Sequence, residues 1–115
     1  MRARRWLESL NEPVLTTDCV VLETFNNLSG FAIRERCHVV MNGLLSRPDL
    51  KLIRAHSTLF DAALKLHRER PDRTWSLTDC ISFVLMKQRD LTAALAFDHH
   101  FEQAGFEALL RCEPG

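Results

Sequence analysis

Three acidic residues stand near points where the chain is expected to pass from one structural element to the next. Glu23 is expected on a helix that follows a strand, Asp79 in the first turn of a buried helix, and Asp98 directly after a strand. Because the carboxyl ends of parallel strands meet at one edge of a sheet, these side chains could converge there. Crowded carboxylates repel, and a divalent cation is their natural counter-charge. Hard oxygen ligands suit Mg²⁺ or Mn²⁺, and hydrolysis of a phosphodiester by metal-activated water is the chemistry that this set would support.

Each acid also has an ordinary structural explanation. Asp79 could serve only as a helix cap, Asp98 only as a turn residue, and Glu23 only as a solvated helix residue. His99 and His100 follow Asp98, but adjacent residues of a helical turn do not share a face, and no second His or Cys stands four residues further on. The two histidines are therefore predicted to be solvated or partly packed rather than zinc ligands.

The stretch 75–106 positions two of the three acids. Ser76 followed by Asp79 is a variant of the capping box, which predicts a helix that begins at Leu77. Residues 80–86 are apolar nearly all round, as in a helix covered on several sides. The apolar run 93–97 predicts a strand covered on both faces, which places Asp98 at its carboxyl end.

The remaining patterns predict strands that alternate with helices. Asp18 is the predicted N-cap of the second helix, with Gly30 just past its end, and Ser57 and Gly105 bound two later helices. The predicted strands are Val14–Thr17, Leu50–Ile53 and 106–110, and the predicted helices are 2–11, 19–29, Phe31–Leu45, 58–70 and the single turn 99–104. Strands separated by helices favour an α/β fold with a parallel β-sheet flanked by helices on both faces.

Length and composition restrict the class of protein further. A chain of 115 residues with 46% apolar content predicts a single domain. Fifteen basic and fifteen acidic residues give no net charge, which is not typical of a strongly basic nucleic-acid binder. We expect no membrane span and a soluble, cytoplasmic protein whose four scattered cysteines are reduced.

The order of these motifs resembles that of a PIN domain, the nuclease fold of the VapC-like toxins of bacterial toxin–antitoxin pairs. The matching segments are VLTTD at 14–18 followed by LET at 22–24, WSLTDC at 75–80, LAFDHHF at 95–101 and QAGF at 103–106. The resemblance implies a PIN-like parallel sheet flanked by helices, an acidic Mg²⁺ or Mn²⁺ site, and endoribonuclease activity. By it, Glu23, Asp79 and Asp98 are catalytic residues and metal ligands. It further implies RNA as the substrate, a cognate antitoxin as a partner, and a homodimer.

The sequence departs from the family pattern at its start and at Ala96. PIN domains open with a central apolar strand that ends in an aspartate, and nothing before Arg2 matches that strand. We therefore expect residues 1–115 to form one PIN-like domain that lacks its first central strand. Such a domain should have marginal stability, or should close the gap by rearranging or by pairing with another chain. Ala96 replaces a hydroxyl residue that usually stands two positions before the aspartate. The alternative function is that of a catalytically inactive remnant that acts as a protein-binding module.

Overall fold

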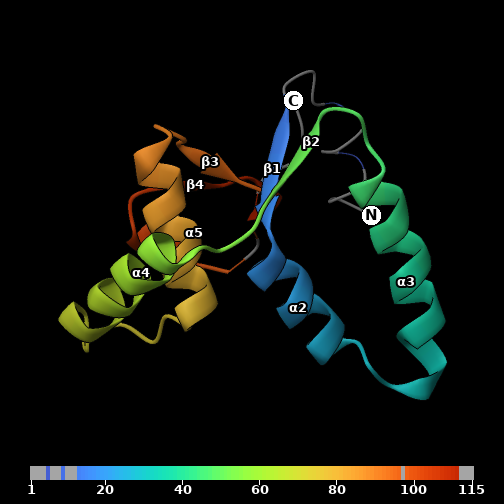
Figure 1. The fold of residues 1–115 in the computed structure, drawn as a ribbon, viewed down its shortest axis with the longest axis horizontal. Coiled ribbons are helices and arrows are strands. Elements are labelled where there is room, and N and C mark those ends of the chain that lie inside the picture. The colour runs from blue at the N-terminus through green and yellow to red at the C-terminus, as the bar shows by residue number, and fades with distance from the viewer. Residues whose placement is uncertain (1–4, 6–8, 10–12, 97, 112–115) are drawn as a thin grey trace. The chain divides into compact units, whose positions relative to one another are not determined.

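The computed structural model describes residues 5, 9, 13–96 and 98–111, and they form two compact units (Figure 1). The β1–β2 unit comprises residues 12–56, and the α4–α5 unit includes the chain from Ser57 onward. The predicted helix at 2–11 falls outside the described residues except for positions 5 and 9.

The β1–β2 unit consists of two parallel strands and two intervening helices. Its elements are β1 (Val14–Thr17), α2 (Asp18–Asn27), α3 (Phe31–Leu45) and β2 (Leu50–Ile53). The strands pair in register from Val14 opposite Leu50 to Thr17 opposite Ile53. A parallel pair needs a long crossover connection, and α2 and α3 supply it. The predicted strands and the predicted helix Phe31–Leu45 are confirmed at their predicted bounds.

The predicted caps of α2 are wrong. Thr17, not Asp18, is the N-cap, and its hydroxyl accepts a hydrogen bond of 3.2 Å from the Val20 N–H. The Asp18 carboxylate instead accepts a hydrogen bond of 3.0 Å from the backbone N–H of Ala55. Because this partner is distant in sequence, the Asp18 side chain does not cap the helix. The helix ends at Asn27, and Gly30 is the N-cap of α3.

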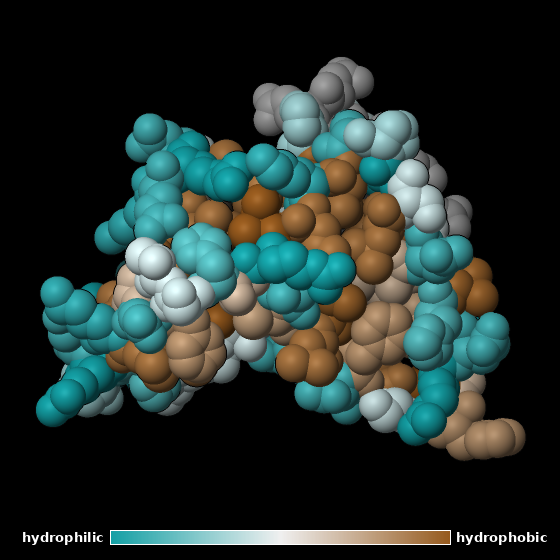
Figure 2. Space-filling view, viewed as in Figure 1, coloured by the Kyte–Doolittle hydropathy of each residue, from teal (hydrophilic) through white to brown (hydrophobic). Residues whose placement is uncertain are grey.

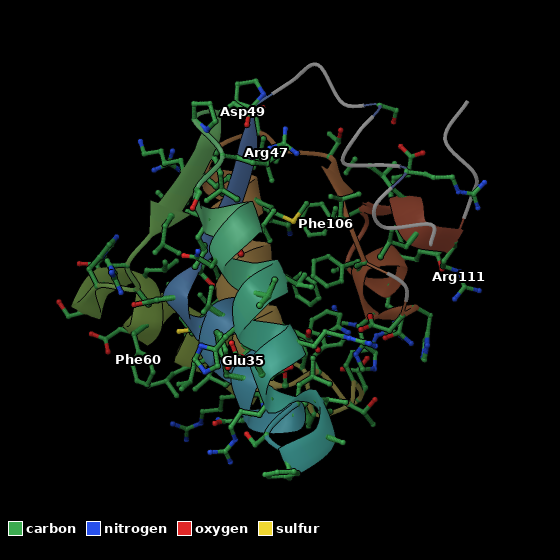
Figure 3. The ribbon with its side chains drawn as sticks, turned by 90° about the vertical axis from the view of Figure 1, so that its right-hand side faces the viewer. Glu35, Arg47, Asp49, Phe60, Phe106 and Arg111 are labelled. Carbon is green, nitrogen blue, oxygen red and sulfur yellow. The ribbon has the colours of Figure 1, made fainter. Side chains whose placement is uncertain are left out.

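The turn between α3 and β2 is closed by a paired arginine and aspartate. Arg47 donates to Asp49 through Nε at 2.8 Å and through a terminal nitrogen at 2.7 Å, and the two side chains lie together in Figure 3. These hydrogen bonds lower the pKa of the Asp49 carboxyl below its usual value. The pair fixes the turn from which β2 starts beside β1.

The α4–α5 unit is built on two packed helices. Its elements are α4 (Ser57–Glu69), α5 (Leu77–Gln88), β3 (Ala93–Ala94), α6 (His100–Gln103), β4 (Glu107–Ala108) and the 3₁₀-helix η1 (Leu109–Arg111). The core lies where α4 meets α5, and its most deeply buried side chains are Leu59, Ala63, Cys80, Ile81 and Phe83. The predicted covered helix is thereby confirmed.

Both ends of α5 have well-defined caps. The predicted capping box is present, with Ser76 and Asp79 exchanging hydrogen bonds at the first turn. At the other end Asp90 takes a left-handed conformation with φ of 55°. Its N–H donates to the Lys87 carbonyl, and the Leu91 N–H donates to the Met86 carbonyl at 2.8 Å, which is the bonding of a Schellman motif.

The last two predicted strands are shorter than expected. β3 covers only Ala93 and Ala94, and it pairs in parallel with Glu107 and Ala108 of β4. Ala93 is exposed, so a strand covered on both faces is the wrong description of it. The ladder stops because the chain turns into η1 after Ala108; the next bond runs from the N–H of Leu110, within η1, to the Ala96 carbonyl.

Both strand pairs are parallel, which confirms an α/β fold with parallel pairing. No helix among the described residues has the length and apolar character that a membrane span requires. Hydrophobic side chains reach the surface on the face drawn in Figure 2. Among the described residues, the exposed large hydrophobic side chains include Leu22, Phe31, Val39 and Val40.

Candidate active site

Asp79 lies in the first turn of α5, where the helix start fixes its carboxylate. Its Oδ2 accepts a 3.1 Å hydrogen bond from the Ser76 N–H, while its own N–H donates to the Ser76 hydroxyl at 3.0 Å. The side chain is only 15% exposed. A negative charge at this position also interacts favourably with the dipole of α5.

Asp98 lies two residues before α6 and is joined to it by a hydrogen bond. Its Oδ1 accepts a 3.0 Å bond from the backbone N–H of His100, the first residue of α6. The side chain is 53% exposed, so Asp98 is much more accessible than Asp79. The acid is thus fixed on one oxygen by the main chain and open to solvent.

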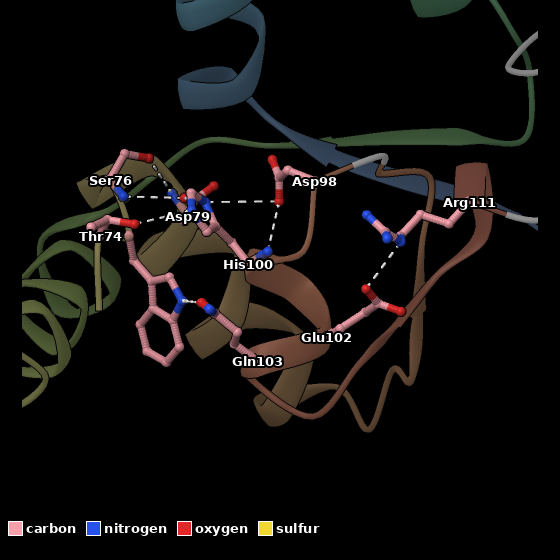
Figure 4. Close-up of polar contacts among 9 residues, drawn as sticks. Thr74, Ser76, Asp79, Asp98, His100, Glu102, Gln103 and Arg111 are labelled. Atoms are coloured by element: carbon pink, nitrogen blue, oxygen red, sulfur yellow. Dashed lines mark hydrogen bonds and ion pairs between the residues drawn. The ribbon is translucent and has the colours of Figure 1, made fainter. Parts of the chain in front are cut away.

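His100 connects the two acids (Figure 4). Its Nδ1 lies 3.1 Å from Oδ2 of Asp79 and 3.8 Å from Oδ1 of Asp98. Its Nε2 lies 3.3 Å from the Thr74 hydroxyl. The three residues place potential ligand atoms within 4.8 Å of one another. The two carboxylates offer the oxygen ligands that Mg²⁺ or Mn²⁺ prefers, and they lie close enough to share one divalent cation.

A second contact between the same segments supports the site. Trp75, beside Thr74, donates from Nε1 to Oε1 of Gln103 at 3.0 Å. The Trp75 and Phe101 rings both meet the Phe83 ring edge-on, each with 4.9 Å between ring centroids. The loop before α5 and the short helix α6 are therefore held together by hydrogen bonds and by the packing of aromatic rings around Phe83.

Cys80 follows Asp79 and is fully buried. Burial raises the pKa of its thiol, and the charge of Asp79 raises it further. The residue is therefore a protonated core thiol and not a nucleophile.

The predicted acids are brought together in part. Asp79 and Asp98 lie in one cluster in the α4–α5 unit, as the sequence predicted. Glu23 is exposed on α2 in the β1–β2 unit, and its part in a metal site stays a prediction.

Sequence reasoning missed the role of His100. The prediction of a partly packed side chain is correct, because His100 is 21% exposed, but its contacts to both acids were not expected. The available signal was its position directly after Asp98 at the start of a single helical turn. At this position the backbone N–H of His100 donates to Asp98, while the imidazole ring extends to Asp79 of α5.

The chain has a VapC-like PIN fold, as comparison with solved structures shows. One similar structure is the crystal structure of VapC20 from Mycobacterium tuberculosis, a sarcin–ricin loop cleaving toxin. The two chains superpose with a TM-score of 0.83 at 25% sequence identity, over 94% of this chain and 82% of that one. No protein-family model and no curated protein matches the sequence. The resemblance indicated by the motifs is thereby confirmed at the level of the fold.

Proposed function

We propose that this protein is a metal-dependent endoribonuclease of the VapC-like toxin type. The observation that carries the proposal is the pairing of Asp79 and Asp98 through His100 in a chain with a VapC-like PIN fold. VapC20, which shares the fold, is a sarcin–ricin loop cleaving toxin. RNA is accordingly the proposed substrate, and a cognate antitoxin and a second copy of the chain are the proposed partners.

Asp79 and Asp98 are the proposed ligands of Mg²⁺ or Mn²⁺. Their carboxylates offer hard oxygen atoms, and the mutual repulsion of the two charges favours a bound cation. When bound there, such a cation would supply an activated water and would neutralise charge on the phosphodiester. Asp79 is partly buried and holds its carboxylate at the start of α5, whereas the more exposed Asp98 is accessible to solvent. Glu23 is the third proposed acid, on the strength of the family resemblance.

RNA cleavage with added Mn²⁺ tests the proposal. The first substrate is a sarcin–ricin loop oligonucleotide, with a mixed total RNA as the second. We expect cleavage by the parent chain, its abolition by EDTA, and its loss in the Asp79→Asn and Asp98→Asn variants. Asp61→Asn is the matched control, because Asp61 is an exposed aspartate of α4 in the same unit.

Two results would contradict the proposal. One is unchanged cleavage by both site variants, which would point to a contaminating nuclease. The other is a folded parent chain that cleaves neither RNA with Mn²⁺ or Mg²⁺. If that chain still bound an antitoxin-like protein, the protein-binding module would be the better description.

A further inference from the structure

His100 makes three polar contacts that use both ring nitrogens and the main chain. Nδ1 meets Oδ2 of Asp79 at 3.1 Å, Nε2 meets the Thr74 hydroxyl at 3.3 Å, and the backbone N–H donates to Asp98 at 3.0 Å. One residue of α6 thus connects the loop before α5, the first turn of α5 and the segment that carries Asp98.

These contacts determine which ring nitrogen carries the proton in the neutral imidazole. An ionised carboxylate only accepts, so Nδ1 must be the donor to Asp79. Nε2 is then an acceptor, and the Thr74 hydroxyl donates to it. Thr74 therefore stabilises the tautomer that donates to the acid, as a partner of a histidine generally does.

Oδ2 of Asp79 accepts from two donors, the ring of His100 and the N–H of Ser76. Neither of these bonds uses Oδ1. In the same way, the bond from the His100 N–H uses Oδ1 of Asp98 and not Oδ2. Each carboxylate is therefore anchored through one oxygen, which leaves the other oxygen as the natural ligand of a cation.

We propose that His100 is a positioning residue that fixes the Asp79 carboxylate for metal binding. This inference rests on the proposed metal-dependent function. His100 acts through Asp79 and is not itself a ligand, because its Nδ1 proton points to the carboxylate and its Nε2 is taken by Thr74. Groups of this kind, which orient metal ligands, typically change metal affinity by about 10–100-fold when they are removed.

Mn²⁺ affinity, measured by isothermal titration calorimetry on the full chain, tests the proposal without any need for activity. His100→Ala removes the ring contacts and keeps the main-chain bond to Asp98, and we expect it to weaken Mn²⁺ binding about tenfold or more. His100→Asn offers an amide N–H near the position of Nδ1, so we expect it to restore most of the affinity. The control is His67→Ala, which removes an exposed histidine of α4 away from the cluster and should bind as the parent does.

The ring tautomer in the parent chain provides a test that needs no variant. ¹⁵N NMR of the histidine rings should show a proton on Nδ1 of His100 before and after saturation with Mg²⁺. A proton on Nε2 instead, or loss of the Nδ1 proton on addition of Mg²⁺, would overturn the proposal, since the second result would make His100 a ligand.

The possible failures are distinguishable. If the parent binds Mn²⁺, Asp79→Asn does not, and folded His100→Ala binds as tightly as the parent, the positioning role is wrong while the metal site stands. If the parent chain binds no Mn²⁺ and cleaves no RNA, the proposed function is wrong and the positioning role is wrong with it.

Discussion

The indole of Trp75 donates a hydrogen bond of 3.0 Å to the side-chain carbonyl of Gln103, which joins the loop before α5 to the short helix α6. A helix of one turn has little stability by itself. The bond therefore helps to determine where α6 lies, and with it the position of His100 beside Asp79.

Replacing Gln103 by Leu should destabilise the protein, because the buried Trp75 N–H would lose its acceptor. The expected decrease in the free energy of unfolding is about 1–3 kcal/mol, measured by urea denaturation. Gln103→Glu keeps an acceptor and should retain most of the stability. Gln88→Leu, at the exposed end of α5, is the control, and an equal loss there would contradict the explanation.

Phe83 is the centre of the aromatic cluster and is only 1% exposed. Its ring contacts those of Trp75, Phe101 and Phe106. Phe83→Ala should lower the free energy of unfolding by about 3–5 kcal/mol, because it removes a large buried side chain and leaves a cavity. Phe60→Ala, at a 41% exposed position of α4, should cost clearly less. Similar losses at both positions would show that the cluster does not form the core of this unit.

Ser76→Ala should weaken the start of α5. It removes the hydroxyl that accepts from the Asp79 N–H, at an expected cost of about 1 kcal/mol in the free energy of unfolding. Ser76→Thr and Ser76→Asp keep a capping oxygen and should lie close to the parent in thermal denaturation. If Ser76→Thr were as damaging as Ser76→Ala, the hydroxyl would not be the stabilising group.

Asp90→Gly should stabilise the protein, because Asp90 ends α5 with a φ of 55° that glycine adopts without steric strain. The expected gain in the free energy of unfolding is up to about 1 kcal/mol. The same change at Asp61, inside α4, should instead cost about 0.3 kcal/mol through loss of helix propensity. Opposite signs at the two aspartates in thermal denaturation would confirm the role of the left-handed position.

The exposed pair Arg70 and Asp72 should give a small, acid-sensitive contribution to stability. Hydrogen bonding from Arg70 lowers the pKa of Asp72 from 3.8 to about 2. Since the folded-state pKa lies below the unfolded one, the contribution is present above pH 3.8 and disappears as the pH falls towards 2. The difference in stability between the parent and Asp72→Asn should shrink over that range. A pH-independent difference in stability between the parent and Asp72→Asn would contradict the assignment.

Local sequence signals predicted the elements whose stabilising contacts are local. The capping box of Ser76 and Asp79 spans three residues, so it could be recognised directly, and α3 follows its apolar pattern from Phe31 to Leu45. The N-cap of α2 was mistaken because Thr17 and Asp18 are both good capping residues. The choice between them depends on Ala55, 37 positions further along the chain, because its backbone N–H donates a hydrogen bond to the Asp18 carboxylate.

The candidate site was predictable to a similar extent. Asp79 and Asp98 follow from their places at element ends, whereas His100 does not, because its role depends on how α6 packs against α5. The extent of β3 was overestimated for a related reason. Apolar residues favour a strand, but a strand also needs a partner, and here the partner turns into η1 after Ala108.

Oδ2 of Asp79 accepts hydrogen bonds from both Ser76 and His100, and this affects which cation the proposed site would select. A cation that takes both oxygens of a carboxylate, as Ca²⁺ often does, would displace Ser76 and His100 and break the start of α5. A cation that takes one oxygen, as Mg²⁺ commonly does, would leave the helix cap intact. At the proposed site the capping box would thus disfavour the larger ion, because binding that ion through both oxygens would cost the helix its cap.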